Sequence, residues 1–254
     1  MTDMADWDLT RLLAEWPYEP GRILARRITG GDGRAKLQLR IDLGVMQMEM
    51  DGRPDGLRPE GADSLLDYQK DRLSRYVSQS GASAGFVLSA DECRALREEA
   101  VQYYHRYVAL NAIGEYAGVV RDAGRNLEVL DLCRDHAALQ SDRVMLEQFR
   151  PALITMQARA EAELALADSL PNQALAALDR GLAKIRTIFE EAGRPEAFDD
   201  DNAVQLLRGM RDALVPRLPA SQRVELEERL RAALDAENYE LAAILRDEIR
   251  LLNA

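Results

Sequence analysis

The chain has 254 residues, 47% of them hydrophobic and 30% charged, which is the composition of a soluble globular protein with one large domain or two small ones. Its formal net charge of −11, from 44 acidic and 33 basic residues, argues against a broad nucleic-acid-binding surface. No apolar run is long enough to cross a bilayer, and two cysteines, Cys93 and Cys133, cannot form a disulfide framework, so we expect a cytoplasmic protein.

Residues 1–62 predict a short helix followed by a small antiparallel sheet. The helix is expected from about Asp8 to before Pro17. From residue 36 the chain alternates, which is typical of a strand with an apolar and a polar side: Leu37, Leu39, Ile41 and Leu43 against Lys36, Gln38, Arg40 and Asp42. Glycines at 30, 31 and 33 predict a hairpin turn back to a strand from Ile23 to Thr29. A change of phase after Gly44 predicts a bulge or a tight bend, and so a sheet of two or three strands.

A basic segment overlaps this predicted sheet. Between residues 21 and 40, Asp32 is the only acid among the basic residues Arg22, Arg26, Arg27, Arg34, Lys36 and Arg40. One interpretation is a solvated strand face that balances the acidic helices. The other is a contact with phosphate or with an acidic partner, which would suit a DNA-repair accessory protein. The overall negative charge favours the first, and the second stays the alternative.

Residues 63–216 predict a helical domain. Helices are expected at about 64–78, 89–111, 116–137, 141–167, 172–191 and 202–214, and Pro151 should kink or split the fourth. Ser89 and Glu92 have the spacing of a capping box at the start of the second. Two helix pairs resemble tetratricopeptide (TPR) hairpins, the later one through a spacing of small and large residues at Ala158, Ala162, Ala174, Leu178 and Gly181. A plain helical bundle is the alternative.

Residues 217–254 predict two short amphipathic helices that break at Glu237-Asn238. Asn238 stands where an N-cap belongs. The apolar residues of each helix fall at spacings of three and four, so they share a face: Leu226, Leu230 and Ala233 in the first helix, and Tyr239, Ala242, Ala243, Leu245, Ile249 and Leu252 in the second. Helices this short are marginal alone, so the hairpin must pack on something.

This C-terminal string closely resembles the UVR motif, the helical hairpin named after the bacterial excision-repair subunits UvrB and UvrC. The residues that carry the resemblance are Leu226, Leu230, Ala233, Asn238, Tyr239, Glu240, Ala242, Ala243, Leu245, Arg246, Asp247 and Ile249. Tyr239 departs from the usual phenylalanine but keeps an aromatic ring. UVR hairpins pair with another UVR hairpin or with a partner protein, in repair subunits, ClpC-type chaperones and McsA-type adaptors. The resemblance therefore implies a bacterial protein that docks a protein partner or a second copy of itself, as in a homodimer.

No group of residues has the pattern of an active site. The chain has no GxxxxGK[ST] phosphate-binding loop and no paired CxxC zinc site. Cys133 and His136 lie three residues apart on one expected helix, but further metal ligands or an orienting group are missing, and helix-end polar residues are the simpler interpretation. We therefore predict a non-enzymatic adaptor without a metal, a cofactor or catalytic residues.

The predicted fold is mainly α within the α+β class. It has three domains, which are the N-terminal helix and sheet at 1–62, the TPR-like helices at 63–216 and the UVR hairpin at 217–254. The predicted partner-binding residues are Leu226, Leu230, Ala233, Tyr239, Ala242, Ala243, Leu245 and Ile249. The exposed charges of Glu240, Arg246 and Asp247 are expected to tune the choice of partner.

Overall fold

The computed structural model describes residues 8–215 and 220–251 of the chain. Contacts divide the chain into two compact units, Met1–Leu153 and Ile154–Ala254. The predicted class is confirmed, because the described residues are mainly helical with one small three-stranded antiparallel sheet. The predicted domain boundaries after residues 62 and 216 are not tested by this division and stay predictions.

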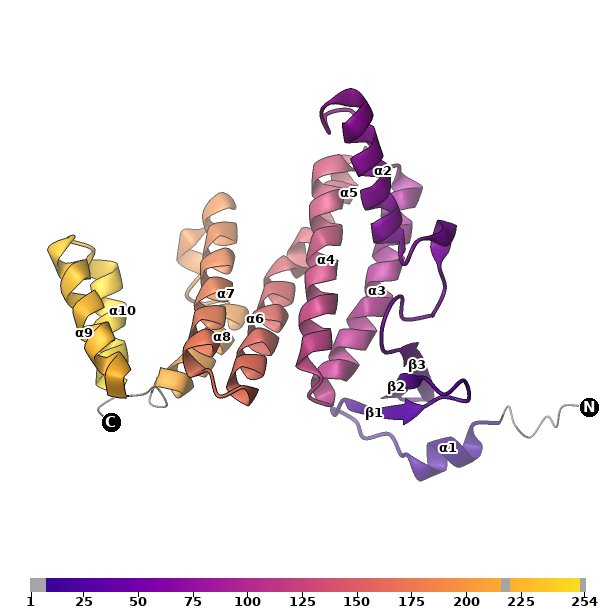
Figure 1. The fold of residues 1–254 in the computed structure, drawn as a ribbon, viewed down its shortest axis with the longest axis horizontal. Coiled ribbons are helices and arrows are strands. Elements are labelled where there is room, and N and C mark those ends of the chain that lie inside the picture. Colours follow the sequence, from indigo (N-terminus) through magenta and orange to yellow (C-terminus); the bar gives the residue numbers. More distant parts are fainter. Residues whose placement is uncertain (1–7, 216–219, 252–254) are drawn as a thin grey trace, which may run out of the picture. The chain divides into compact units, whose positions relative to one another are not determined.

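The α-helices and strands of the first unit are labelled in Figure 1, and two short 3-10 helices, named with η, lie between them. They are α1 (Thr10–Glu15), β1 (Leu24–Thr29), β2 (Ala35–Ile41), β3 (Gly44–Glu49), η2 (Pro59–Gly61), α2 (Leu65–Ser80), α3 (Ala90–Ala112), α4 (Tyr116–His136), α5 (Gln140–Val144) and η3 (Glu147–Phe149). The next helix, α6 (Arg150–Ala167), crosses the division and starts one residue before Pro151, so the predicted split at this proline is confirmed. The elements that follow are α7 (Pro171–Glu191), η4 (Pro195–Ala197), α8 (Asn202–Leu214), α9 (Ala220–Asp235) and α10 (Tyr239–Leu251).

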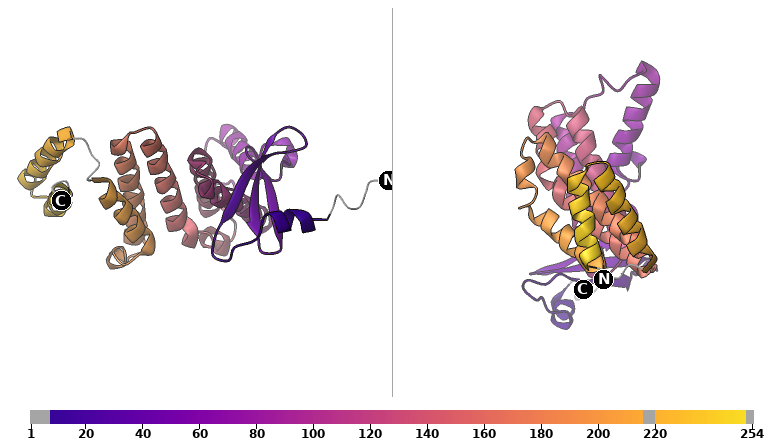
Figure 2. Two further views of the ribbon diagram at one scale, coloured as in Figure 1. Left: turned by 90° about the horizontal axis from the view of Figure 1, so that it is seen from below. Right: turned by 90° about the vertical axis from the view of Figure 1, so that its left-hand side faces the viewer.

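The sheet has the order β1-β2-β3, with both pairs antiparallel, and Figure 2 shows the three strands side by side. Ile41 pairs with Gly44, so only Asp42 and Leu43 form the turn, and the phase change is a tight bend. The prediction that Ile41 and Leu43 lie on the buried side is wrong, because the chain reverses there and leaves both exposed. Leu37 and Leu39, in the body of β2, are buried as predicted.

The polar side of β2 is also buried, and the prediction of a solvated face is wrong for Lys36 and Arg40. The Lys36 ammonium forms ion pairs with Asp32 at 2.8 Å and with Glu49. The Arg40 guanidinium donates to the backbone oxygen of Trp16 at 2.7 Å. This side of the strand is therefore shielded from water by the segment between α1 and β1, and the Lys36 charge is neutralised by ion pairs within the chain.

Helices α2, α3 and α8 start at side-chain caps, one of which, the Ser89 and Glu92 capping box, the sequence predicts. The Ser89 hydroxyl accepts from the Glu92 amide at 3.2 Å and the Glu92 carboxylate accepts from the Ser89 amide at 2.8 Å, which confirms the capping box of α3. The Ser64 hydroxyl accepts from the Asp67 amide at 3.1 Å at the start of α2. The Asp201 carboxylate caps α8 through the Ala203 amide at 2.9 Å.

A buried ion pair joins α3 to α4. The Arg106 guanidinium donates to both Asp122 carboxylate oxygens, at 2.6 and 2.8 Å, and both side chains are fully enclosed. Arg106 also donates to the backbone oxygens of Glu49 at 3.1 Å and Gly52 at 2.8 Å. One side chain therefore fixes the two longest helices of this unit to the end of the sheet.

The two cysteines lie together in the apolar core between α3 and α4. Cys93 and Cys133 are both buried, with free thiols, in the same apolar cluster. Burial raises the pKa of Cys133 to about 12 and also raises the pKa of Cys93. The thiolate is the reactive form, so neither residue is suited to nucleophilic or redox chemistry.

We expect both thiols to resist a thiol reagent at pH 8 in the native protein and to react within minutes in 6 M guanidinium chloride. The measurement is release of thionitrobenzoate from Ellman's reagent, with free cysteine as the control. Rapid reaction of one or both thiols without denaturant would contradict the buried arrangement.

In the second unit, small residues bring α6 and α7 close together. A Cβ atom added at Gly181 would lie 2.7 Å from the Ala158 Cβ, which is too short for a real contact, so only glycine fits. Ala162, Ala174 and Leu178 are buried as the spacing of small and large residues predicts. That these helices form a TPR-like pair stays a prediction.

Candidate functional site

The C-terminal hairpin consists of α9 and α10, joined by a turn whose geometry follows from two residues. Glu237 has a left-handed backbone with φ of 54°. Asn238 then caps α10, because its side-chain oxygen accepts from the Leu241 amide at 3.1 Å. The Asn238 amide donates to the backbone oxygen of Ala233 at 2.9 Å and closes the end of α9. The predicted break and N-cap are confirmed.

We expect Asn238→Ala to destabilise the hairpin by about 1 kcal/mol, because the Leu241 amide would lose its side-chain acceptor. Asn238→Asp, which keeps an acceptor, should cost a few tenths of a kcal/mol at most. Amide hydrogen exchange of α10 in the two variants measures the difference. Equal protection in the alanine and aspartate variants would contradict the capping role.

Six of the predicted partner-binding residues form the interior of the hairpin. Leu226, Ala233, Ala242 and Leu245 are buried in one cluster, with Leu230 and Ile249 packed against it and partly buried. The same cluster includes Val215, just after α8, and Leu175 of α7. These residues hold α9 and α10 together and seat the hairpin within its own unit.

The other predicted residues lie nearer the surface. Tyr239 is 68% exposed, so its ring is not part of the hairpin's interior, and its predicted contact with a partner stays a prediction. It is the first residue of α10, and Ala242, about one helical turn later, is the first buried residue of this helix. Ala243 is half-buried, whereas the charged residues Glu240, Arg246 and Asp247 are exposed.

Sequence reasoning missed a second apolar strip on α10. Leu241 and Ile244 lie three residues apart on a side of the helix that does not face α9, and they are 38% and 40% exposed. The spacing of three between Leu241 and Ile244 is visible in the sequence, but the longer apolar series that includes Ala242 and Leu245 gave the stronger signal.

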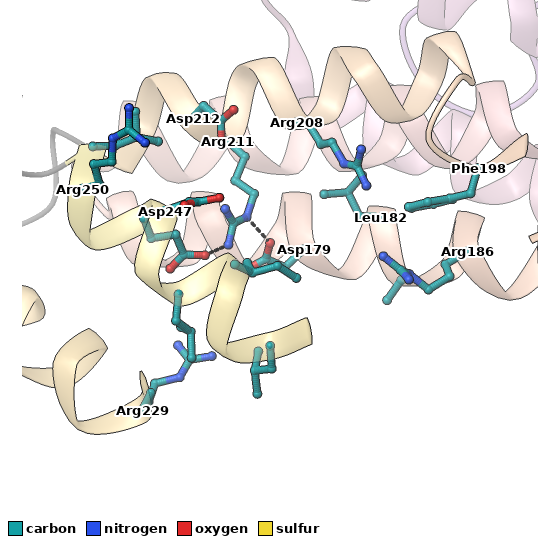
Figure 3. A pocket seen from close by; sticks show the side chains of 16 residues that line it. Asp179, Leu182, Arg186, Phe198, Arg208, Arg211, Asp212, Arg229, Asp247 and Arg250 are labelled. Atoms are coloured by element: carbon teal, nitrogen blue, oxygen red, sulfur yellow. Dashed lines mark hydrogen bonds and ion pairs between the residues drawn. The ribbon is translucent and has the colours of Figure 1, made fainter. Parts of the chain in front are cut away.

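An ion-pair triad, also missed, connects α10 to α7 and α8. The Arg211 guanidinium of α8 forms an ion pair with Asp179 of α7 at 2.6 Å and another with Glu248 of α10 (Figure 3). Glu248 is buried and Arg211 nearly so. Near the other end of α10, Arg186 and Glu240 form an exposed pair at 2.9 Å, which contributes little.

Beside this triad lies a groove of about 750 Å³ between α10 and the pair α7 and α8. We call it the α10 groove. Its apolar lining comes from both sides, with Leu182 and Ala183 of α7 facing Leu241, Ile244 and Leu251 of α10. Arginines and aspartates from α7, α8, α9 and α10 surround it, as Figure 3 shows.

The predicted basic segment is largely engaged within the chain. Arg26 donates to Gln38 at 2.9 Å and lies 4.2 Å over the Trp16 ring, and Arg34 pairs with Asp32 at 2.8 Å. The exposed Arg22 and Arg27 pair with Glu19 and with Glu115 at 3.4 Å. The structure does not arrange the six basic residues as one unpaired surface, and a nucleic-acid contact here stays a prediction.

The candidate Cys133 and His136 do not converge on a site. Cys133 is buried, whereas the His136 ring packs edge-on against Phe86 with centroids 5.4 Å apart. Within residues 8–215 and 220–251, no three His, Cys, Asp or Glu side chains are placed to hold a metal ion. Over those same ranges, no helix has the length and apolar character that a bilayer span requires.

A known family model matches the C-terminal hairpin. The UvrB/uvrC motif, UVR, matches residues 221–254. This match covers α10 and nearly all of α9, and leaves the rest of the chain unmatched. No curated protein matches the chain, and neither does any solved structure.

Proposed function

We propose that this protein is a non-enzymatic bacterial adaptor that docks a protein partner, or a second copy of itself, through its C-terminal UVR hairpin. The observation that carries the proposal is the match of the UVR motif to 221–254. UVR is a protein-interaction motif related to DNA repair. The proposed compartment is the cytoplasm.

The exposed apolar side chains of the hairpin support this proposal. Tyr239, Leu241 and Ile244 remain accessible on α10, although most of the hairpin's leucines and alanines are consumed in its own packing. A partner that covers them removes apolar surface from water, which is the main favourable term in most protein association. Glu240, Arg246 and Asp247 stand exposed beside them and can select among partners by charge.

The helices before the hairpin have a supporting role in this proposal. We propose that α6 and α7 form a TPR-like pair on which the hairpin is presented. The close approach at Gly181 and Ala158 supports it, because interlocked small residues are how such helices pair. The Leu175 contact with the hairpin's cluster supports the presenting role.

The test compares the full chain with a chain that ends at residue 219. Each is immobilised, exposed to a bacterial lysate and washed, and the retained proteins are identified by mass. Sedimentation velocity of each purified chain over a range of concentrations measures self-association. We expect a retained protein, or dimer formation, that depends on residues 220–254. Equal recovery and equal sedimentation would defeat the proposal.

A further inference from the structure

The α10 groove has the surface chemistry of a site that accepts a helix. Its walls are helices on both sides, and the apolar strip of Leu241 and Ile244 has no covering element among the described residues. An added helix can pack its own apolar side chains between such walls, as in other helix-in-groove complexes. Within the described part of Ile154–Ala254 there is no strand, so this unit offers no sheet edge to an extended peptide there.

Four arginines surround this apolar lining in addition to Arg211. Arg186 and Arg208 both lie over the ring of the groove residue Phe198, with guanidinium carbons 4.6 and 5.2 Å from its centroid. Arg229 of α9 and Arg250 of α10 have no acidic partner among the described residues. The guanidinium groups of these four arginines can therefore form ion pairs with the carboxylates of a partner protein.

The acids around the groove do not balance these arginines. Asp179 and Glu248 both form ion pairs with Arg211. The remaining lining acids are Asp212 and Asp247, and the remaining lining arginines number four. Arg186 and Arg208 do have acidic partners outside the groove, Glu240 and Asp199, but both acids are mostly exposed and such pairs exchange at little cost. The lining itself has five arginines against four acids, whereas the whole chain has a formal charge of −11.

We propose that the α10 groove binds an amphipathic helix of a partner protein, with its apolar side on Leu182, Leu241 and Ile244 and acidic side chains toward Arg186, Arg208, Arg229 and Arg250. This inference rests on the proposed function, since it names the surface and the chemistry of the partner that the hairpin docks. Apolar burial supplies affinity, and the arginines select acidic over basic helices.

The experiment uses the full chain and two fluorescein-labelled peptides of about 16 residues, long enough to form a helix on binding. Both carry the same leucine and alanine stripe, with glutamates on its flanks in one and lysines in the other. We expect fluorescence anisotropy to show saturable binding of the glutamate peptide and at least tenfold weaker binding of the lysine peptide. Absent binding, or equal binding of both, overturns the proposal. Labelled duplex DNA is the third probe, and tighter binding of the duplex than of the glutamate peptide also overturns it.

Charge reversal locates the site. Arg229→Glu with Arg250→Glu changes two groove arginines, and Arg180→Glu with Arg231→Glu is the matched control, because those two exposed arginines lie on α7 and α9 outside the groove. We expect the groove variant to bind the glutamate peptide at least tenfold more weakly and the control to bind within twofold of the native chain. Equal loss in both variants would mean that only net charge matters, and would overturn the groove as the site.

The result separates this inference from the proposed function. If residues 220–254 prove necessary for partner capture while the glutamate peptide fails, the adaptor proposal stands and the groove proposal falls. If neither peptide binds and truncation changes nothing, both fall.

Discussion

Replacing Asp122 with alanine is expected to destabilise the unit Met1–Leu153 by about 3–5 kcal/mol, the typical cost of removing one partner of a buried ion pair. The Arg106 guanidinium would remain enclosed without its bidentate acceptor. Its other acceptors are backbone oxygens, which do not neutralise its charge. A loss of this size is a large fraction of the total stability of a domain.

Urea unfolding followed by tryptophan fluorescence measures this loss, because Ile154–Ala254 contains no tryptophan and Trp16 lies under the Arg26 guanidinium in this unit. Asp51→Ala is the control, since Asp51 forms an exposed pair with Arg121 and its removal should cost less than about 1 kcal/mol. The double variant Arg106→Met with Asp122→Leu should recover part of the stability, because it removes both charges. An Asp122→Ala midpoint as high as that of Asp51→Ala would refute the assignment.

Replacing Arg211 with alanine is expected to release α10 from α7 and α8. The buried Glu248 carboxylate would lose its cation, and Asp179 its link to α8. A cost of about 2–3 kcal/mol corresponds to roughly 100-fold faster amide exchange in α10, if exchange proceeds by opening of the hairpin. Hydrogen exchange resolved by peptide measures this directly.

Arg208→Ala is the matched control, since Arg208 lies one helical turn earlier on α8 and its acidic partner Asp199 is mostly exposed. Its effect on α10 exchange should stay within about threefold. Adding Glu248→Leu to Arg211→Ala should restore much of the protection, because the stranded charge is then gone. Unchanged α10 exchange in Arg211→Ala would show that the triad does not hold the hairpin.

The helices could be predicted from the sequence where local signals specify them. Ser64, Ser89 and Asn238 each stand at a cap that the structure contains, because a cap depends on residues three or four apart. The strand β2 was predicted two residues too long, since alternation alone does not reveal where a chain reverses. Buried polar residues such as Lys36 escaped prediction because their partners are fixed by the sheet register and the segment before it.

The sequence identified the C-terminal hairpin as the candidate site, but it did not show which side chains of the hairpin are exposed. The apolar series that includes Leu226 and Leu245 identified the hairpin. The same residues are buried in the packing of the hairpin itself. Which apolar side chains stay exposed depends on how α9 and α10 pair and on the contacts with α7 and α8. The triad around Arg211 depends on that docking too, and it joins three helices distant in sequence, so no local pattern reveals it.

The most direct measurement compares partner capture by two double variants of the full chain. Leu241→Ser with Ile244→Ser changes the exposed strip of α10, and Val224→Ser with Leu234→Ser changes two apolar residues of α9 outside the groove that are somewhat more exposed. With circular dichroism unchanged, we expect the α10 variant to lose at least nine tenths of the captured protein and the α9 variant to retain most of it. Full capture by the α10 variant would contradict the account.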